Sequence, residues 1–338
     1  MSNNTLHKLG IDIGSTTVKV AVLDENDNLL FSDYERHFAN IRETLSLLVE
    51  KAYKQLGDMQ IAPMITGSGG LTLAKHLDVP FVQEVISVST ALQHYAPQTD
   101  VAIELGGEDA KIIYFEGGNV EQRMNGICAG GTGSFIDQMA SLIQTDATGL
   151  NEYAKNYKAI YPIAARCGVF AKTDIQPLIN EGASIEDLAA SIFQAVVNQT
   201  ISGLACGHPI KGKVAFLGGP LSFLSELRAR FTETLGLAAE DIIFPENSKY
   251  FVAIGAALLS EKYGETTLGA IVNALDNIDA SEVSDTKHIE PLFESEADYA
   301  EFTARHAADK VKTGELAKAS GRLYLGIDAG STTTKSAL

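Results

Sequence analysis

Two segments of this chain share one pattern, a buried strand followed by a glycine turn and a second strand. The first is LGIDIGSTTVKVAVL at residues 9–23, where apolar residues are interrupted by Asp12 just before the turn. The second is VAIELGGEDAKIIYFEGGNV at residues 101–120, where Glu104 stands in the corresponding place. Strands joined by short glycine turns form hairpins. The duplication of this unit within residues 1–260 predicts two related lobes with a cleft between them.

The other periodic segments predict an α/β protein. Apolar residues recur at helical spacing in residues 41–56 and 185–205. Residues 214–220, VAFLGGP, are typical of a buried strand that ends in glycines. Residues 251–260 predict a helix whose small residues permit close contact with a neighbour.

Composition excludes several classes of function. The chain carries 43 acidic and 26 basic residues, a net charge of −17, which argues against nucleic acid as a partner. No run approaches the ~20 apolar residues of a membrane span, and the first ten residues lack the features of a secretory signal. Three widely spaced cysteines fit a reducing cytoplasm. We therefore expect a cytoplasmic protein that binds neither nucleic acid nor membrane.

The first glycine turn has the composition of a phosphate cradle. A turn rich in Gly, Ser and Thr directs several backbone N–H groups and hydroxyls to one point. Asp12, at the end of its strand, would face the same point, and a carboxylate beside a phosphate needs a cation, usually Mg²⁺ held through water. The residues predicted to hold phosphate here are Gly14, Ser15, Thr16, Thr17 and Lys19.

The second turn offers the carboxylate of Glu104 and the glycines Gly106 and Gly107. Two such hairpins facing each other could hold the phosphate tail of a nucleotide from both sides. Neither turn matches the spacing of a P-loop or of a Rossmann dinucleotide site.

The ordered set DIGSTTVK, ELGGEDAK, FLGGP and AIGAA resembles the nucleotide signature of the acetate and sugar kinase, Hsp70 and actin superfamily. The resemblance covers about residues 8–262. It implies a two-lobed, ribonuclease H-like α/β fold with a nucleotide cleft, lobe I formed by about residues 1–95 plus 245–262 and lobe II by about residues 96–244.

NGICAGGTGSFIDQMA (125–140) and ARCGVFAKTDIQPLINEG (165–182) are similar to one branch of this superfamily. That branch contains the activators of 2-hydroxyacyl-CoA dehydratases and the ATPase subunits of benzoyl-CoA reductases, the BadF/BadG/BcrA/BcrD type. The resemblance implies ATP and Mg²⁺ as ligands, and a homodimer that shares one [4Fe-4S] cluster through Cys128 and Cys167 of each subunit. It also implies a ferredoxin- or flavodoxin-like electron donor and a dehydratase or reductase iron–sulfur protein as acceptor.

The same resemblance assigns roles to further residues. Asp12 and Glu104 would be catalytic, although the family usually has Asp where this chain has Glu104, which moves the carboxylate by about one methylene. The predicted contacts on the adenosine side are Gly218, Gly219 and Pro220. The loop that links nucleotide to cluster would consist of Gly130, Gly131, Thr132 and Gly133.

Two other functions remain open from sequence. A sugar or hydroxy-acid kinase of this fold would need a general base, for which Asp109 and Asp137 are candidates. A non-catalytic, filament-forming actin-like protein would use nucleotide only as a conformational ligand. Cys206 is interpreted as a small core residue and not as a ligand.

The C-terminal part differs in character. Residues 276–301 carry nine acidic side chains and one basic one, which predicts an acidic linker over about residues 263–320. Residues 325–338, LGIDAGSTTTKSAL, then repeat residues 9–22 with ten of fourteen positions identical. We interpret residues 321–338 as the truncated start of a second ATPase domain, in a fragment of a longer tandem protein.

Overall fold

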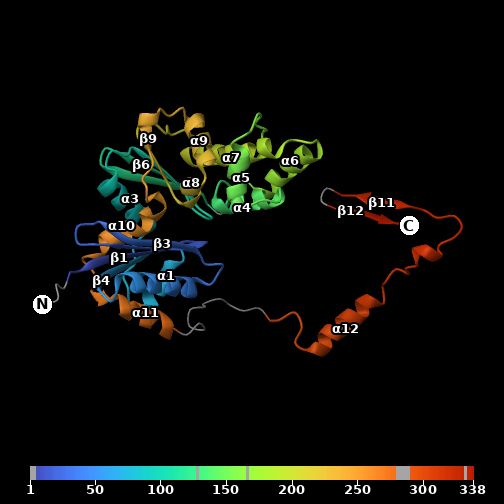
Figure 1. The fold of residues 1–338 in the computed structure, drawn as a ribbon, viewed down its shortest axis with the longest axis horizontal. Helices are drawn as coiled ribbons and strands as arrows, with labels where there is room; N and C mark the ends of the chain where they lie inside the picture. The colour runs from blue at the N-terminus through green and yellow to red at the C-terminus, as the bar shows by residue number, and fades with distance from the viewer. Residues whose placement is uncertain (1–4, 127–128, 165–166, 279–289, 331–332) are drawn as a thin grey trace. The chain divides into compact units, whose positions relative to one another are not determined.

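The computed structural model describes residues 5–126, 129–164, 167–278, 290–330 and 333–338. The chain divides into two compact units, residues 1–283 and 284–338, and each is described by itself. The larger unit contains two five-stranded sheets with helices around them (Figure 1). These sheets define lobe I and lobe II.

In lobe I the central strand β1 (His7–Ile13) pairs antiparallel with its hairpin partner β2 (Thr17–Leu23) and parallel with β4 (Gln60–Thr66). Every residue of β1 from Lys8 to Ile13 is buried, as expected for a central strand. In spatial order the strands are β10 (Thr266–Thr267), β4 (Gln60–Thr66), β1 (His7–Ile13), β2 (Thr17–Leu23) and β3 (Leu29–Arg36).

Lobe II repeats this plan. Its central strand β5 pairs antiparallel with β6 and parallel with β8, so the two lobes share both the hairpin and the parallel neighbour. In spatial order the strands are β7 (Asn119–Met124), β6 (Ala110–Glu116), β5 (Val101–Leu105), β8 (Val214–Leu217) and β9 (Ile242–Ile243).

Two helices, α3 (Glu84–Tyr95) and α10 (Phe251–Ser260), pack between the sheets in a core that includes side chains of β2, β5, β6 and β8. The two helices are in close contact, because a Cβ at Gly255 of α10 would lie 1.7 Å from the Ser87 backbone oxygen of α3. Strand β1 is equally close to α10, because a Cβ at Gly10 would lie 1.8 Å from the Ala253 backbone oxygen. Only glycine fits at these two positions. The prediction of a close-packed helix at residues 251–260 is confirmed.

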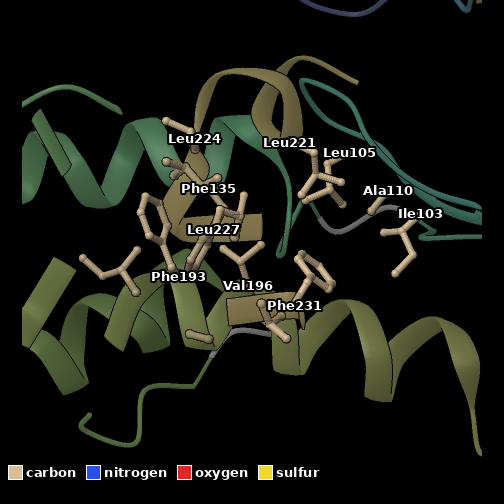
Figure 2. Packing of buried hydrophobic residues seen from close by; sticks show 14 of the residues in the cluster. Ile103, Leu105, Ala110, Phe135, Phe193, Val196, Leu221, Leu224, Leu227 and Phe231 are labelled. Carbon is tan, nitrogen blue, oxygen red and sulfur yellow. The ribbon is translucent and has the colours of Figure 1, made fainter. Parts of the chain in front are cut away.

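Lobe II has its own core on the outer face of its sheet (Figure 2). Ile103 and Leu105 of β5 contribute to the same cluster as Phe193 of α7 and Phe231 of α9. The helices on this side are α4 (Gly133–Leu142), α5 (Ala147–Ala154), α6 (Gly168–Asn180), α7 (Ile185–Thr200), α8 (Gly219–Phe223) and α9 (Ser225–Leu235).

Helix α7 continues into a π-helical turn, Ile201–Ala205. Contrary to the expectation from sequence, the combined stretch is long and apolar enough to cross a membrane, and it is the single such helix in the described residues. However, 67% of its apolar window is buried inside the protein, which is typical of a core helix.

The outer face of the lobe I sheet is covered by α1 (Ile41–Leu56) and α2 (Gly70–His76), and also by a segment that the sequence assigned to the linker. Strand β10 pairs with β4, and α11 (Leu268–Asn277) buries Leu268, Ile271 and Leu275 against lobe I. These three side chains recur at helical spacing and form one apolar stripe. The structure therefore extends lobe I to about residue 278, beyond the expected boundary at residue 262.

The smaller unit contains α12 (Glu296–Ala307) and a hairpin formed by β11 (Gly326–Ala329) and β12 (Thr334–Ala337). Phe293 packs edge-on against Tyr299 and Phe302 of α12. The described residues of the hairpin are exposed.

Candidate functional site: a cleft between two hairpins

The first hairpin places a buried ion pair at the mouth of lobe I. Asp12 and Lys19 are opposite each other in the register of β1 and β2, and Lys19 Nζ lies 2.6 Å from Asp12 Oδ2. Asp12 is 2% exposed. Burial acts to lower the pKa of Lys19, but the charge of Asp12 and the hydrogen bond to it outweigh burial, so the pKa of Lys19 is raised. The ammonium therefore stays charged.

The turn of this hairpin is braced from both sides. The Gly14 N–H donates to the Thr17 carbonyl at 2.9 Å, and the His37 N–H donates to the Thr16 carbonyl at 3.2 Å. The Gly69 N–H, from the turn after β4, donates to the Ile13 carbonyl. These bonds fix a turn whose Thr16 and Thr17 side chains line the cleft.

The second hairpin has the same acid–lysine register with different electrostatics. Glu104 of β5 is opposite Lys111 of β6, but Lys111 Nζ is 3.7 Å from Glu104 Oε1. Lys111 lies closer to two other carboxylates, at 2.6 Å from Glu84 Oε2 and in a short contact with Asp109. Glu104 Oε2 is buried without a hydrogen-bond partner among the described residues.

Glu104 consequently has a strongly perturbed carboxyl group. Burial raises its pKa to about 7, Lys111 and Lys19 oppose the rise, and the negative charges of Asp109 and Glu84 add to it. A carboxylate that changes charge near neutral pH is suited to proton transfer.

The two hairpins meet directly. A Cβ at Gly107 would lie 2.0 Å from Thr16 Oγ1, so glycine at this position lets the turns of the two lobes come together. Side chains and backbone of both lobes line a single pocket at this point. Its walls are formed by Thr16, Thr17, Lys19, Tyr34, Arg36, Glu104, Leu105, Gly106, Gly107, Gly133, Ser134, Asp137, Gly218, Gly219 and Pro220.

Helix α4 begins on the turn of the second hairpin. The Gly133 N–H donates to the Gly106 carbonyl at 3.0 Å, and the Ser134 N–H donates to the Gly107 carbonyl at 2.7 Å. Thr132 is fully buried at the N-cap of this helix. Two backbone hydrogen bonds therefore tie the first turn of α4 to the glycine turn.

On the other side of the pocket, β8 ends in the two predicted glycines. Gly218 has φ +88°, and a Cβ there would lie 2.1 Å from the Leu105 oxygen, so a larger residue does not fit. Tyr34 of lobe I stacks edge-on against Phe223 of lobe II at 5.8 Å between ring centroids. Arg36 of lobe I pairs with Asp137 of α4 at 2.8 Å. These two contacts bridge the lobes across the pocket.

Ten of the residues predicted to bind nucleotide or to act in catalysis line this pocket, and six do not. Of the six, Asp12 reaches the pocket through Lys19, and Gly14 shapes the first turn. Ser15 is exposed and lines a neighbouring hollow with Glu84, Asp109 and Lys111. Gly130, Gly131 and Thr132 belong to the loop before α4 and lie outside the pocket lining.

The two candidate bases for a kinase are both engaged. Asp109 pairs with Lys111, and Asp137 pairs with Arg36. Each carboxylate would have to leave its ion pair to act as a base.

The cysteines fall in different environments. Cys167 is a half-buried free thiol at the N-cap of α6, and Val169 and Phe170 beside it are 69% and 64% exposed. Cys206 is exposed and not a core residue as interpreted from sequence; it caps the π-helical turn with φ +48°. Cys128 lies outside the described residues. Within the described part of the chain no group of three His, Cys, Asp or Glu side chains is placed to hold a metal ion.

Sequence reasoning missed Tyr34, Arg36, Ser134, Glu84 and Lys111. One signal was available for Lys111: it follows Glu104 by seven residues, as Lys19 follows Asp12. The positions of the others depend on how the two lobes dock, which no local pattern encodes.

The duplicated sheet plan, the facing glycine hairpins and the two helices between the lobes define the α/β fold of the actin, Hsp70 and sugar-kinase class. Within that class, residues 9–260 match the model of the BadF/BadG/BcrA/BcrD ATPase family. The chain belongs to this family, as its sequence motifs predicted.

Named relatives are consistent with this family membership. The chain is 28% identical over 259 residues to the 2-hydroxyisocaproyl-CoA dehydratase activator of Clostridioides difficile, a match that covers 75% of this chain and 94% of the relative. It is 28% identical over 263 residues to the (R)-2-hydroxyglutaryl-CoA dehydratase activating ATPase of Acidaminococcus fermentans, covering 76% and 98%. The crystal structure of component A of that Acidaminococcus fermentans dehydratase superposes with a TM-score of 0.68 at 26% identity, covering 76% of this chain and 98% of that one.

Proposed function

We propose that this protein is an activator of a 2-hydroxyacyl-CoA dehydratase or of a related reductase. It would hydrolyse ATP in the interlobe cleft and use that reaction to drive low-potential electron transfer to its partner. The observation that carries the proposal is the bonding of α4 to the second glycine turn, because it joins the phosphate side of the cleft to the helix that follows the Cys128 loop. The relatives named as dehydratase activators support the same role.

In this proposal the two hairpins hold the phosphates of ATP. Thr16, Thr17 and Lys19 from lobe I, and the backbone of Gly106 and Gly107 from lobe II, line the cleft where the phosphates would lie. Asp12 fits a Mg²⁺ ion held through water, since it is a buried carboxylate paired only with the flexible lysine ammonium in the described residues. Bound Mg²⁺ would neutralise phosphate charge.

Glu104 would direct the attacking water. Its free Oε2 is buried beside the cleft, and its raised pKa lets it accept a proton near neutral pH. The reaction consumes one ATP and one water, and releases ADP and phosphate. Gly218, Gly219 and Pro220 would border the adenosine, with Tyr34 and Phe223 beside them.

For the iron–sulfur group we propose Cys128 and Cys167 from each of two subunits. Cys167 fits this role, because it is a free, half-buried thiol at the N-cap of α6. A [4Fe-4S] cluster, when bound, supplies one-electron chemistry. The exposed Val169 and Phe170 give the neighbourhood of Cys167 an apolar surface suited to a second copy of the chain.

Helix α6 begins against α4, since a Cβ at Gly168 would lie 2.8 Å from Gln138 Oε1. A displacement of the glycine turn would thus pass to α4 and from α4 to the start of α6. The electron would come from a reduced ferredoxin or flavodoxin and leave for the iron–sulfur partner in a reducing cytoplasm.

Anaerobic purification of the full chain tests the proposal. We expect iron and sulfide, an absorbance near 400 nm that dithionite bleaches, and ATP hydrolysis that requires Mg²⁺. Replacing both Cys128 and Cys167 by Ser should remove the iron and leave ATP binding intact, while Cys206→Ser, the matched control, should keep both. Iron retained by the double variant would refute the ligand assignment. Phosphorylation of a sugar by an iron-free protein would instead support a kinase.

A further inference from the structure

Glu84, the first residue of α3, contacts both lobes and is not among the residues of the proposed mechanism. Its Oε1 accepts a hydrogen bond at 2.9 Å from the Ser68 N–H, in the turn after β4 of lobe I. Its Oε2 lies 2.6 Å from Lys111 Nζ of β6 in lobe II. One carboxylate therefore holds the backbone of one lobe and an ammonium of the other.

Lys111 is a single cation shared among three carboxylates. The Lys111 side chain is 3% exposed, so water contributes little to stabilising its positive charge. It contacts Glu84 and Asp109 closely and Glu104 only at 3.7 Å. The ammonium is thus drawn toward Glu84 and Asp109, away from the carboxylate that faces it in the hairpin register.

Among the described residues, the other cation that acts on Glu104 is Lys19. The charged groups that act on it are Lys111 of β6, Asp109 of the hairpin turn, Glu84 of α3 and Lys19 of β2. Lys19 is committed to Asp12 at 2.6 Å. The charge of Glu104 is therefore governed by how Lys111 is divided among its partners.

We propose that Glu84 is a positioning residue for Glu104: anchored to the turn at residues 67–70 of lobe I, it holds Lys111 away from Glu104 while the lobes are in this arrangement. The inference rests on the proposed ATP hydrolysis for its role in the cycle. Separation of the lobes would withdraw Glu84 and leave Lys111 to Glu104 and Asp109. The charge of the carboxylate that faces the cleft would then follow the position of the lobes.

The raised pKa of Glu104, to about 7, is consistent with this geometry. Removing the charge of Glu84 should lower it for two reasons: one repelling carboxylate is lost, and Lys111 is released toward Glu104. Removing Lys111 should raise it, since the attractive charge disappears. The two variants therefore have opposite expected signs.

The test is a pH titration of the nucleotide-free full chain by NMR of ¹³C-labelled glutamate carboxyls, with the Glu104 signal assigned by its loss in Glu104→Gln. We expect Glu84→Gln to move the midpoint down by about one pH unit, Glu84→Asp to move it less, and Lys111→Met to move it up. Glu35→Gln is the matched control, because Glu35 is a lobe I carboxylate that pairs with a lysine elsewhere, Lys51. If Lys111→Met does not fold, Asp109→Asn, which removes a second repelling carboxylate, should shift the midpoint down as Glu84→Gln does.

An unchanged Glu104 midpoint in folded Glu84→Gln would overturn the proposal, because a purely structural role for Glu84 would alter stability and not this titration. A second arm measures the acid limb of ATP hydrolysis, which should move down with the NMR midpoint in Glu84→Gln. If the protein does not hydrolyse ATP, the proposed function fails while the titration still decides the role of Glu84.

Discussion

The hairpin at residues 9–22 and the described part of its near-copy at residues 325–338 share the same strand pairing in different surroundings. In the first, Asp12 is opposite Lys19, and the Gly14 N–H donates to the Thr17 carbonyl at 2.9 Å. In the second, Asp328 is opposite Lys335, and the Gly330 N–H donates to the Thr333 carbonyl at 3.0 Å. Register and turn bonding are therefore set locally by the sequence.

Burial separates the two copies. The Asp12–Lys19 pair has a 2.6 Å contact with side chains 3% and 12% exposed, whereas the Asp328–Lys335 pair has a 3.5 Å contact with side chains 69% and 73% exposed. An exposed ion pair contributes little to stability because water screens it. A hairpin becomes part of a site only when the rest of a lobe encloses its ion pair.

The largest test of this contrast removes the lysine from each copy. Lys19→Met leaves Asp12 buried without its ionic partner, which should destabilise the protein by about 3–5 kcal/mol. Lys335→Met should change stability by about 0.5 kcal/mol or less. Urea unfolding followed by far-UV circular dichroism checks both. Equal effects would mean that burial is not what distinguishes the two hairpins.

A second pair of variants probes the packing beneath each hairpin. Gly10→Ala places a methyl group 1.8 Å from the Ala253 backbone oxygen of α10, whereas the nearest atom to a Cβ at Gly326 is 3.8 Å away. The first change should cost about 3 kcal/mol through overpacking, and Gly326→Ala should be nearly neutral. Thermal unfolding of the two variants gives the comparison, and a stable Gly10→Ala protein would contradict the close contact of β1 with α10.

The last test compares these hairpins with the hairpin of lobe II, through the pH dependence of stability that Glu104 causes. The pKa of Glu104 is raised from its usual 4.5 to about 7, so its contribution to stability is present below about pH 4.5 and is lost as pH rises through 7. Glu104→Gln cannot titrate. The stability of this variant relative to wild type should therefore increase by about 3 kcal/mol between pH 4 and pH 8.

Denaturant unfolding at both pH values measures this change. Gly326→Ala, which changes no titratable group, serves as the control and should show no comparable trend. A pH-independent difference between Glu104→Gln and wild type would show that folding does not raise the pKa of Glu104.

Much of the candidate site could be predicted because it depends on local patterns. Alternating apolar residues around a glycine turn specify each hairpin, and Asp12, Lys19 and Glu104 lie within those hairpins. Tyr34 and Arg36 are ordinary positions of β3, and their contacts with Phe223 and Asp137 form only when lobe II docks against them. Glu84 could not be identified for the same reason, since both of its contacts are distant in sequence.

The fold was predictable to a similar extent. The helix expected at residues 41–56 is α1 with those bounds, because its apolar residues repeat with the helical period. Helix α11 was not expected, although Leu268, Ile271 and Leu275 form a short stripe that covers lobe I. Helix α11 is only ten residues long and is followed by an acidic stretch, so its apolar stripe did not stand out in the sequence.

The near-identity of the two hairpins also bears on how the chain avoids misfolding. Repeated segments in one polypeptide can exchange places during folding, and here either copy has the register to pair as the centre of the lobe I sheet. The second copy has Ala329, Thr334 and Ser336 where the first has Ile13, Val18 and Val20. In the first copy these three side chains are fully buried. Inserting it would leave cavities and place two hydroxyl groups in an apolar core, a penalty of several kcal/mol by an order-of-magnitude estimate. These few substitutions are enough to make the wrong hairpin a poor competitor for the nascent sheet.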